Sequence, residues 1–223
     1  MLRGHPPFLA LKQGAHYIAS VMSLPQTSRR LTEAEYLDIE RGAEFKSEFF
    51  DGEMFAMAGG TPQHSLIGSN LIREFGNRLD NSPCVAYNTD LRIKVDATGL
   101  CTYPDLSVIY GPLQFAEGTD DTVTNPTVLV EVLSNSTEAY DRGRKFEHYR
   151  QIVTLQEYRL VSQTEPRIEQ FVRQSDDRWL LIEAAGIEKN LELPSLKITV
   201  ALSKIFAKVN FVPVPIRPTP PPR

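Results

Sequence analysis

Two continuous apolar runs rich in β-branched residues mark the middle of the chain, at residues 103–110 and 127–133. Runs without polar alternation are typical of strands buried on both faces of a sheet. The first run contains Asp105 and the second contains Glu131. Removing an ionised carboxylate from water is costly unless a partner compensates it. The pattern therefore predicts two neighbouring strands that share a cation, either a divalent metal ion, the ammonium group of Lys145, or both.

Helical patterns mark three further segments. A capping box that begins at Thr32 predicts a helix over residues 32–41. Apolar residues recur at helical spacing over residues 64–79, as expected for an amphipathic helix packed on a sheet. Residues 137–151, which follow the Glu131 run, are predicted to form the third helix.

Short strand-like runs occupy most of the remaining chain. Asp51 and Gly52 tolerate the backbone conformation of a tight turn, so residues 46–57 predict a β-hairpin. Further strands are predicted at residues 84–95, 100–110, 157–162, 167–173 and 179–184, and an amphipathic segment at 198–209 closes the domain. These elements predict an α/β fold with a mixed β-sheet flanked by helices, an N-terminal hairpin and extra C-terminal strands.

Length and composition indicate one domain. The chain has 223 residues, of which 41% are hydrophobic and 23% are charged, as in ordinary globular proteins. We place the domain at residues 29–210, after a disordered N-terminal extension at 1–28 and before a disordered tail at 211–223 that contains six prolines. No run approaches the roughly 18 apolar residues of a membrane span, and the start lacks the apolar centre of a signal peptide. We therefore expect a cytoplasmic protein with no membrane partner.

Charge and cysteine content narrow the possible partners. A net charge of −4 does not indicate a general nucleic-acid binder, because phosphate contacts need clustered lysine and arginine. Arg142 and Arg144 form a local basic cluster beside Lys145 and are the candidate DNA contacts. Cys84 and Cys101 lack metal-type spacing and lie in apolar runs, so we expect buried, reduced thiols.

An ordered set of residues resembles the PD-(D/E)xK nuclease superfamily. Within it, the chain is similar to the restriction-endonuclease-like family of small bacterial proteins that is abundant in cyanobacteria and was long described only as a domain of unknown function. The resemblance covers roughly residues 31–206. It is carried by Glu48, Asp51, Gly52, Glu53, His64, Pro104, Asp105, Glu131, Val132, Leu133, Ser134, Asp141, Lys145 and Tyr149.

The chain departs from the superfamily pattern at one position. The usual lysine two residues after the glutamate is replaced by Leu133. The resemblance implies that this lysine has moved to Lys145 on the following helix, from which it reaches back into the same site. The alternative is that Lys145 and Asp141, four residues apart, form a surface ion pair worth a few tenths of a kcal/mol.

The resemblance also implies a reaction. Asp105 and Glu131 would hold Mg²⁺ or Mn²⁺, which prefer oxygen ligands, together with the carbonyl group of Val132. Lys145 would orient the attacking water and stabilise the transition state of phosphodiester hydrolysis. Supporting roles fall to residues that could add a carboxylate or position a phosphate, namely Glu48, Glu53, His64 and Asp141.

Three functions remain open from the sequence. The first is a metal-dependent DNA endonuclease, which we expect to act as a homodimer because a symmetric pair of sites cuts both strands of a duplex. The second is a catalytically silent DNA-binding or interaction module with the nuclease fold, consistent with Leu133. The third is a hydrolase with two carboxylates, such as a glycosidase, for which a single tryptophan offers little sugar-stacking surface.

Overall fold

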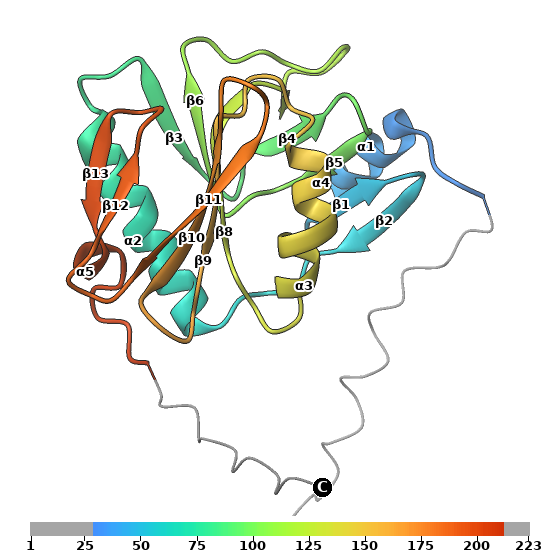
Figure 1. Ribbon diagram of the computed structural model, residues 1–223. Helices are drawn as coiled ribbons and strands as arrows, with labels where there is room; N and C mark the ends of the chain where they lie inside the picture. Colours follow the sequence, from blue (N-terminus) through green and yellow to red (C-terminus); the bar gives the residue numbers. More distant parts are fainter. Residues whose placement is uncertain (1–28, 212–223) are drawn as a thin grey trace, which may run out of the picture. The chain divides into compact units, whose positions relative to one another are not determined.

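The computed structural model describes residues 29–211 (Figure 1). The predicted extension at residues 1–28 lies outside the described residues, as does the predicted tail apart from Phe211. Phe211 belongs to the domain, since its ring lies 5.5 Å from that of Phe206. No helix in the described part of the chain is long and apolar enough to cross a membrane.

A six-stranded sheet forms the centre of the domain. Its strand order is β11-β10-β9-β8-β6-β3. The strands are β3 (Cys84–Asn88), β6 (Leu106–Tyr110), β8 (Pro126–Val132), β9 (Glu157–Val161), β10 (Arg167–Arg173) and β11 (Trp179–Ala185). The pair β8 and β9 is parallel and the other neighbours are antiparallel, which confirms the predicted mixed sheet.

A second sheet has the order β2-β1-β5-β4-β7 and stands beside the first (Figure 1). Its strands are β1 (Ser47–Phe50), β2 (Glu53–Ala56), β4 (Arg92–Val95), β5 (Leu100–Thr102) and β7 (Thr122–Val123). The predicted hairpin is confirmed as β1 and β2, with positive φ angles of 50° at Asp51 and 80° at Gly52.

Two predicted strands were wrong in their extent. The runs at residues 84–95 and 100–110 each break into two strands that join different sheets. In the first, a turn forms where the side chain of Asn88 accepts from the N–H of Asp90. In the second, Pro104 cannot donate to a strand ladder and restricts the residue before it. Asp105 consequently lies in a bend where the chain passes from one sheet to the other.

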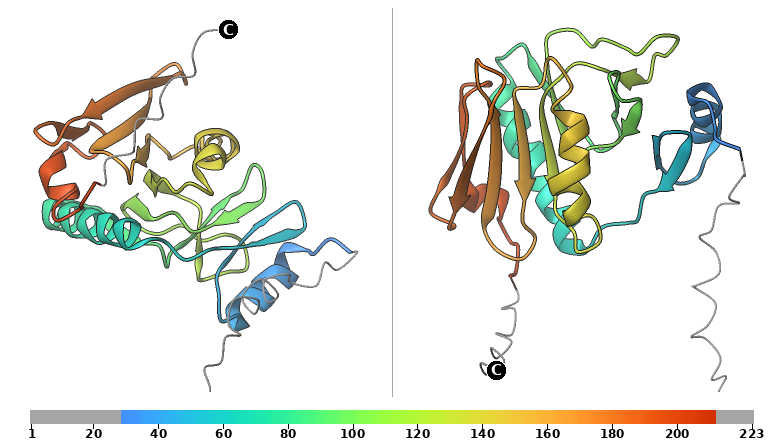
Figure 2. Two further views of the ribbon diagram at one scale, coloured as in Figure 1. Left: turned by 90° about the horizontal axis from the view of Figure 1, so that it is seen from below. Right: turned by 45° about the vertical axis from the view of Figure 1, so that its right-hand side comes forward.

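Helices cover both faces of the central sheet (Figure 2). One face packs on α2 (Pro62–Leu79), which confirms the predicted amphipathic helix and buries Ile67, Leu71 and Phe75. The other face packs on a helical segment made of α3 (Glu138–Tyr140), η1 (Asp141–Lys145) and α4 (Phe146–Tyr149). The shorter helix α1 (Glu33–Gly42) has the predicted capping box at Thr32 and packs on β1, where the rings of Tyr36 and Phe49 stack 4.8 Å apart.

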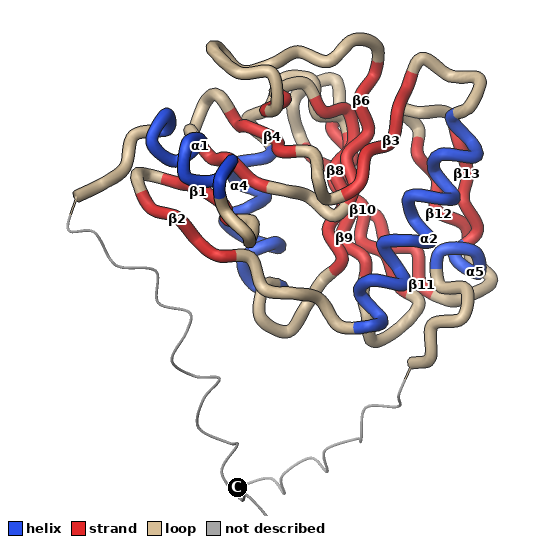
Figure 3. Tube along the Cα trace, turned by 180° about the vertical axis from the view of Figure 1, so that it is seen from behind, coloured by secondary structure: helices blue, strands red, loops and turns tan. Residues whose placement is uncertain are grey.

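The C-terminal part forms a small hairpin beside α2 (Figure 3). It consists of β12 (Asn190–Leu193) and β13 (Ile198–Ala201), followed by α5 (Leu202–Ile205). The sequence pattern missed β12, which is held to the central sheet by a fully buried pair, Glu157 and Arg159. Arg159 donates to the carbonyl of Glu192, and Glu157 accepts from the N–H of Ser195. Cys84 and Cys101 are buried free thiols, as predicted.

Candidate active site

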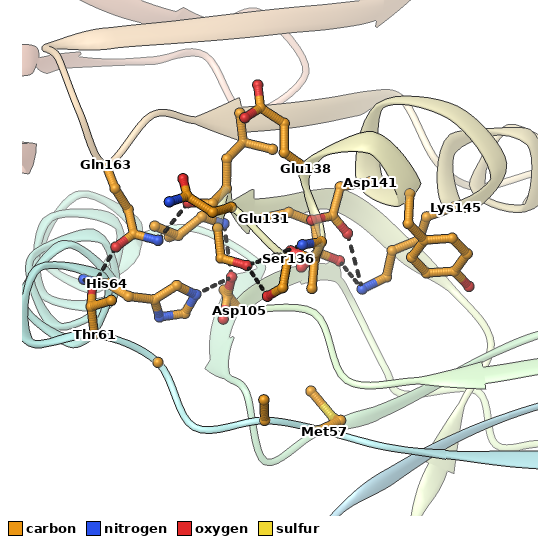
Figure 4. A pocket seen from close by; sticks show the side chains of 18 of the residues that line it. Met57, Thr61, His64, Asp105, Glu131, Ser136, Glu138, Asp141, Lys145 and Gln163 are labelled. Carbon is orange, nitrogen blue, oxygen red and sulfur yellow. Dashed lines mark hydrogen bonds and ion pairs between the residues drawn. The ribbon is translucent and has the colours of Figure 1, made fainter. Parts of the chain in front are cut away.

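A cleft of about 1100 Å³ opens where the two sheets meet. Six of the predicted site residues that line it come from five places in the chain, and Figure 4 shows how several of them converge. The residues are Glu48 on β1, His64 in the first turn of α2, Asp105 in the bend before β6, Glu131 on β8, and Asp141 and Lys145 on η1.

Lys145 lies at the centre of a group of buried carboxylates. Its Nζ is 2.9 Å from Oε1 of Glu131, 3.0 Å from Oε1 of Glu48 and 3.6 Å from Oδ1 of Asp141. The side chain of Lys145 is only 5% exposed, and that of Asp141 is 4% exposed. The interpretation of Lys145 and Asp141 as a surface ion pair is therefore wrong. Although burial alone lowers the pKa of Lys145, the carboxylates of Glu131, Glu48 and Asp141 outweigh it and raise that pKa well above its ordinary value.

A π-helical turn presents Asp141 and Lys145 to the cleft. The regular helix predicted over residues 137–151 is wrong in this respect, because η1 interrupts it. A π-helical turn is wider than an α-helical one, and such turns are common at functional sites. Both ends of η1 are buried, whereas Arg144 between them is exposed at the rim of the cleft.

Glu131 is an acid whose proton is held unusually tightly. Burial raises its pKa to about 8, against the opposing effect of Lys145. The hydroxyl of Tyr149 donates a hydrogen bond of 2.8 Å to Oε1 of Glu131. The sequence assigned Tyr149 no role in the site. No spacing rule links Tyr149 to a strand 18 positions earlier, so its contact with the site went unpredicted.

Asp105 is oriented by the neighbouring strand and by α2. The backbone N–H of Val132 donates to Oδ2 of Asp105 at 2.7 Å, and Nε2 of His64 lies 3.3 Å from the same oxygen. The hydrogen bond with Asp105 raises the pKa of His64, although burial opposes the shift. Asp105 in turn contributes to the raised pKa of Glu131, so the two carboxylates interact electrostatically.

The pair of His64 and Asp105 predicts a pH-dependent stability. A histidine whose pKa is raised on folding stabilises the fold below its ordinary pKa, about 6.5, and loses that contribution as pH rises through the raised value. The stability advantage of the wild type over His64→Gln should therefore shrink between pH 6 and pH 8 in urea unfolding. His148, whose pKa is lowered mainly by burial, provides the control, because His148→Gln should show the opposite trend. A constant difference for His64→Gln would contradict the assignment.

Two of the predicted site residues lie elsewhere. Glu53 is exposed on β2, opposite Phe50 in the hairpin, and does not line the cleft. Arg142 does not line the cleft and pairs with two carboxylates, Glu138 at 2.8 Å and Glu169 in a shorter contact. Arg144 lines the cleft and makes no ion pair within the described residues, which keeps it as a candidate phosphate contact.

The carboxyl groups of the cleft are ligands of the kind that Mg²⁺ prefers, but in the described part of the chain they do not form a preformed metal site. No group of three or more His, Cys, Asp or Glu side chains among residues 29–211 is arranged to hold a metal ion. Mg²⁺ commonly binds through one or two carboxylates and completes its shell with water and substrate phosphate oxygens. Four carboxyl groups, those of Glu48, Asp105, Glu131 and Asp141, lie around Lys145 and His64, and oxygen ligands of this kind suit Mg²⁺.

Known proteins are similar to this chain in sequence or in fold. The family model described as "Uma2: Putative restriction endonuclease" matches residues 33–203. Two Synechocystis proteins described as uncharacterized are similar. The protein slr1290 is 38% identical over 82% of this chain and 94% of its own length, and sll1609 is 35% identical over 79% and 100%.

A solved structure from Anabaena variabilis has the same fold. It is described as a "putative nuclease belonging to DUF820", and it covers 78% of this chain and 96% of its own with a TM-score of 0.64. The sequence identity is 17%, so the likeness concerns the fold. The predicted mixed α/β architecture is thereby confirmed.

Proposed function

The chain belongs to the Uma2 family, and from the geometry of its cleft we propose that it is a metal-dependent endonuclease that hydrolyses phosphodiester bonds in DNA. One observation carries the proposal. An almost fully buried lysine, Lys145, contacts Glu131 and Glu48 in an open cleft that Asp105 also lines. A buried ion cluster contributes little net stability, because removing its charges from water is costly. Its presence in an open cleft therefore favours a catalytic role.

Each residue has a role that follows from its position. Asp105 and Glu131 are the proposed metal ligands, with the carbonyl of Val132 beside them and Mg²⁺ or Mn²⁺ as the ion. When bound, such an ion acidifies water and neutralises charge on the scissile phosphate. Lys145 orients the attacking water and stabilises the charge that develops on the phosphate. Glu48 and Asp141 hold the ammonium group of Lys145 in place, and Tyr149 fixes the carboxylate of Glu131.

Leu133 offers a test of the displaced lysine. Strand alternation places its side chain on the same face as that of Glu131, and it is buried in a cluster with Tyr149 and Tyr158. We expect the double variant Lys145→Met with Leu133→Lys to cleave about tenfold faster than Lys145→Met alone, because the new amine approaches the same carboxylates. The matched control is Lys145→Met with Leu133→Met. Equal rates in the two double variants would show that the two positions do not serve one site.

Nicking of supercoiled plasmid DNA tests the proposed function directly. We expect conversion to open-circular and linear forms with Mg²⁺ or Mn²⁺ and none with a chelator. A well-folded protein that binds DNA but never cuts it with either ion would instead support the silent-module alternative. We further propose that the active form is a homodimer, which light scattering on the same preparation would test.

A further inference from the structure

One wall of the cleft is apolar and open. Phe55 on β2 and the three residues after it form what we call the apolar ledge, Phe55, Ala56, Met57 and Ala58, all of which line the cleft. Phe55 is 48% exposed, so its ring is accessible to a ligand in the cleft. Figure 4 shows Met57 on the side of the cleft opposite Glu131 and Gln163, so the ledge faces the proposed catalytic groups.

Strand pairing fixes Phe55 next to the catalytic lysine. Phe55 is the direct partner of Glu48 in the antiparallel hairpin, so both side chains stand on one face of the sheet. Glu48 in turn lies 3.0 Å from Nζ of Lys145. Phe55 and Lys145 are therefore both neighbours of Glu48, so a base stacked on Phe55 would lie beside the proposed catalytic group.

The charges in the cleft do not suit a grip on duplex DNA. The lining contains five carboxylates, Glu48, Asp105, Glu131, Glu138 and Asp141. Among the lining cations, Lys145 is surrounded by carboxylates, and Arg167 pairs with Glu165, Glu169 and Glu183. Arg144 is the remaining strong cation of the lining. Because phosphate contacts supply most of the affinity for duplex DNA, this cleft needs another source of binding energy.

We propose that Phe55 is a stacking platform for an unpaired base and that the substrate is DNA with a single-stranded region at the cleavage site. Stacking on an aromatic ring is a main source of affinity for single strands and is tolerant of sequence. A base that is already unpaired binds without the energy needed to extrude it from a duplex. This inference rests on the proposed function in its choice of DNA as the ligand.

Binding of short DNA oligonucleotides tests the inference. A 2-aminopurine base is placed in a single strand and in the same strand paired as a duplex, with Ca²⁺ as the divalent ion. We expect the single strand to bind at least about tenfold more tightly than the duplex. Phe55→Ala should weaken single-strand binding by roughly 5- to 100-fold and abolish the change in 2-aminopurine fluorescence, while duplex affinity stays within about twofold.

Two further variants separate stacking from a general loss of structure. Phe55→Trp should restore single-strand affinity. Phe45→Ala is the matched control, since Phe45 is 65% exposed but does not line the cleft, and it should bind like the wild type. Equal effects of Phe55→Ala and Phe45→Ala would overturn the inference. So would a Phe55→Ala variant that changes only the mass measured by light scattering, because Phe55 would then contact a second copy of the chain.

Failure of this inference is distinguishable from failure of the proposed function. Metal-dependent plasmid cleavage by a protein whose single-strand binding is unchanged in Phe55→Ala would keep the nuclease and remove the stacking platform. Selective, Phe55-dependent binding of single strands by a protein that never cleaves DNA would support the stacking platform and remove the nuclease.

Discussion

Replacing Lys145 with methionine is expected to lower the rate of metal-dependent cleavage by about a hundredfold to a thousandfold, the usual effect of losing one preorganised electrostatic group. Methionine keeps much of the length of the side chain but provides no charge and no donor. The groups that Lys145 contacts, Glu131 and Glu48, would remain in the cleft without their ammonium partner. Initial rates of plasmid nicking at saturating Mg²⁺ measure the effect.

The same substitution should also lower the free energy of unfolding, by more than the loss of an exposed salt bridge would. Removing one partner of a buried ion cluster typically costs about 3–5 kcal/mol. Protonation of Glu131 offsets part of this loss, since its pKa is already about 8 and would rise further without the ammonium group. A carboxyl whose pKa is raised on folding destabilises the fold increasingly as pH rises above its unfolded value. The deficit of Lys145→Met should therefore be larger at pH 8 than at pH 6 in urea unfolding.

A lysine outside the cleft provides the control for both measurements. Lys94 on β4 is 15% exposed and pairs with Glu33 at 2.8 Å, but it does not line the cleft. Lys94→Met should lower stability modestly and leave the cleavage rate unchanged. If Lys145→Met retained full activity, the proposed mechanism would lose its central residue and the silent-module alternative would be favoured.

Local signals in the sequence predicted the parts of the fold that depend on residues close together in the chain. The capping box at Thr32 and the turn at Asp51 and Gly52 are satisfied within a few positions, so their residues determine the geometry. The apolar run through Pro104 misled because its residues are buried on both sides of the break, and periodicity does not report a change of sheet. The bend that resulted is what orients Asp105 toward β8.

The sequence indicated which residues form the candidate site better than it indicated the contacts between them. Charge burial predicted that Asp105 and Glu131 need a cation, and the resemblance to the nuclease superfamily added Lys145 to the same site. The sequence contains no comparable signal for η1, whose altered hydrogen bonding depends on packing, or for the contact between Tyr149 and Glu131. The positions of Glu53 and Arg142 outside the cleft were not predictable, because long-range strand packing and ion pairs such as that of Arg142 with Glu169 cannot be inferred from neighbours in the chain.

Neutralising either carboxylate proposed to hold the metal should abolish cleavage to the limit of detection. Asp105→Asn and Glu131→Gln preserve size, and each retains an oxygen that accepts from Val132 or Tyr149 respectively. The stability of Glu131→Gln relative to the wild type should rise between about pH 5 and pH 8, because the wild-type carboxyl, whose pKa is raised to about 8, has to take up a proton on folding. Both variants should lose heat of binding in calorimetric titration with Mn²⁺. Glu53→Gln, exposed on β2 and outside the cleft, is the control and should behave like the wild type.

The pH dependence of Mn²⁺ binding distinguishes the role of Glu131 from a general loss of negative charge. Glu131 has to release its proton before its carboxylate can hold a cation, so wild-type affinity should rise by up to about tenfold per pH unit between pH 6 and pH 8 and then level off. The levelling follows from the sign of the shift, since above a pKa of about 8 the carboxylate is ionised without further help. The negative charge of Asp105 contributes to the raised pKa of Glu131, so titration of metal-free Asp105→Asn should show a lower pKa for Glu131. Affinity that is unchanged in both variants at every pH would place the metal elsewhere and remove Asp105 and Glu131 from the proposed site.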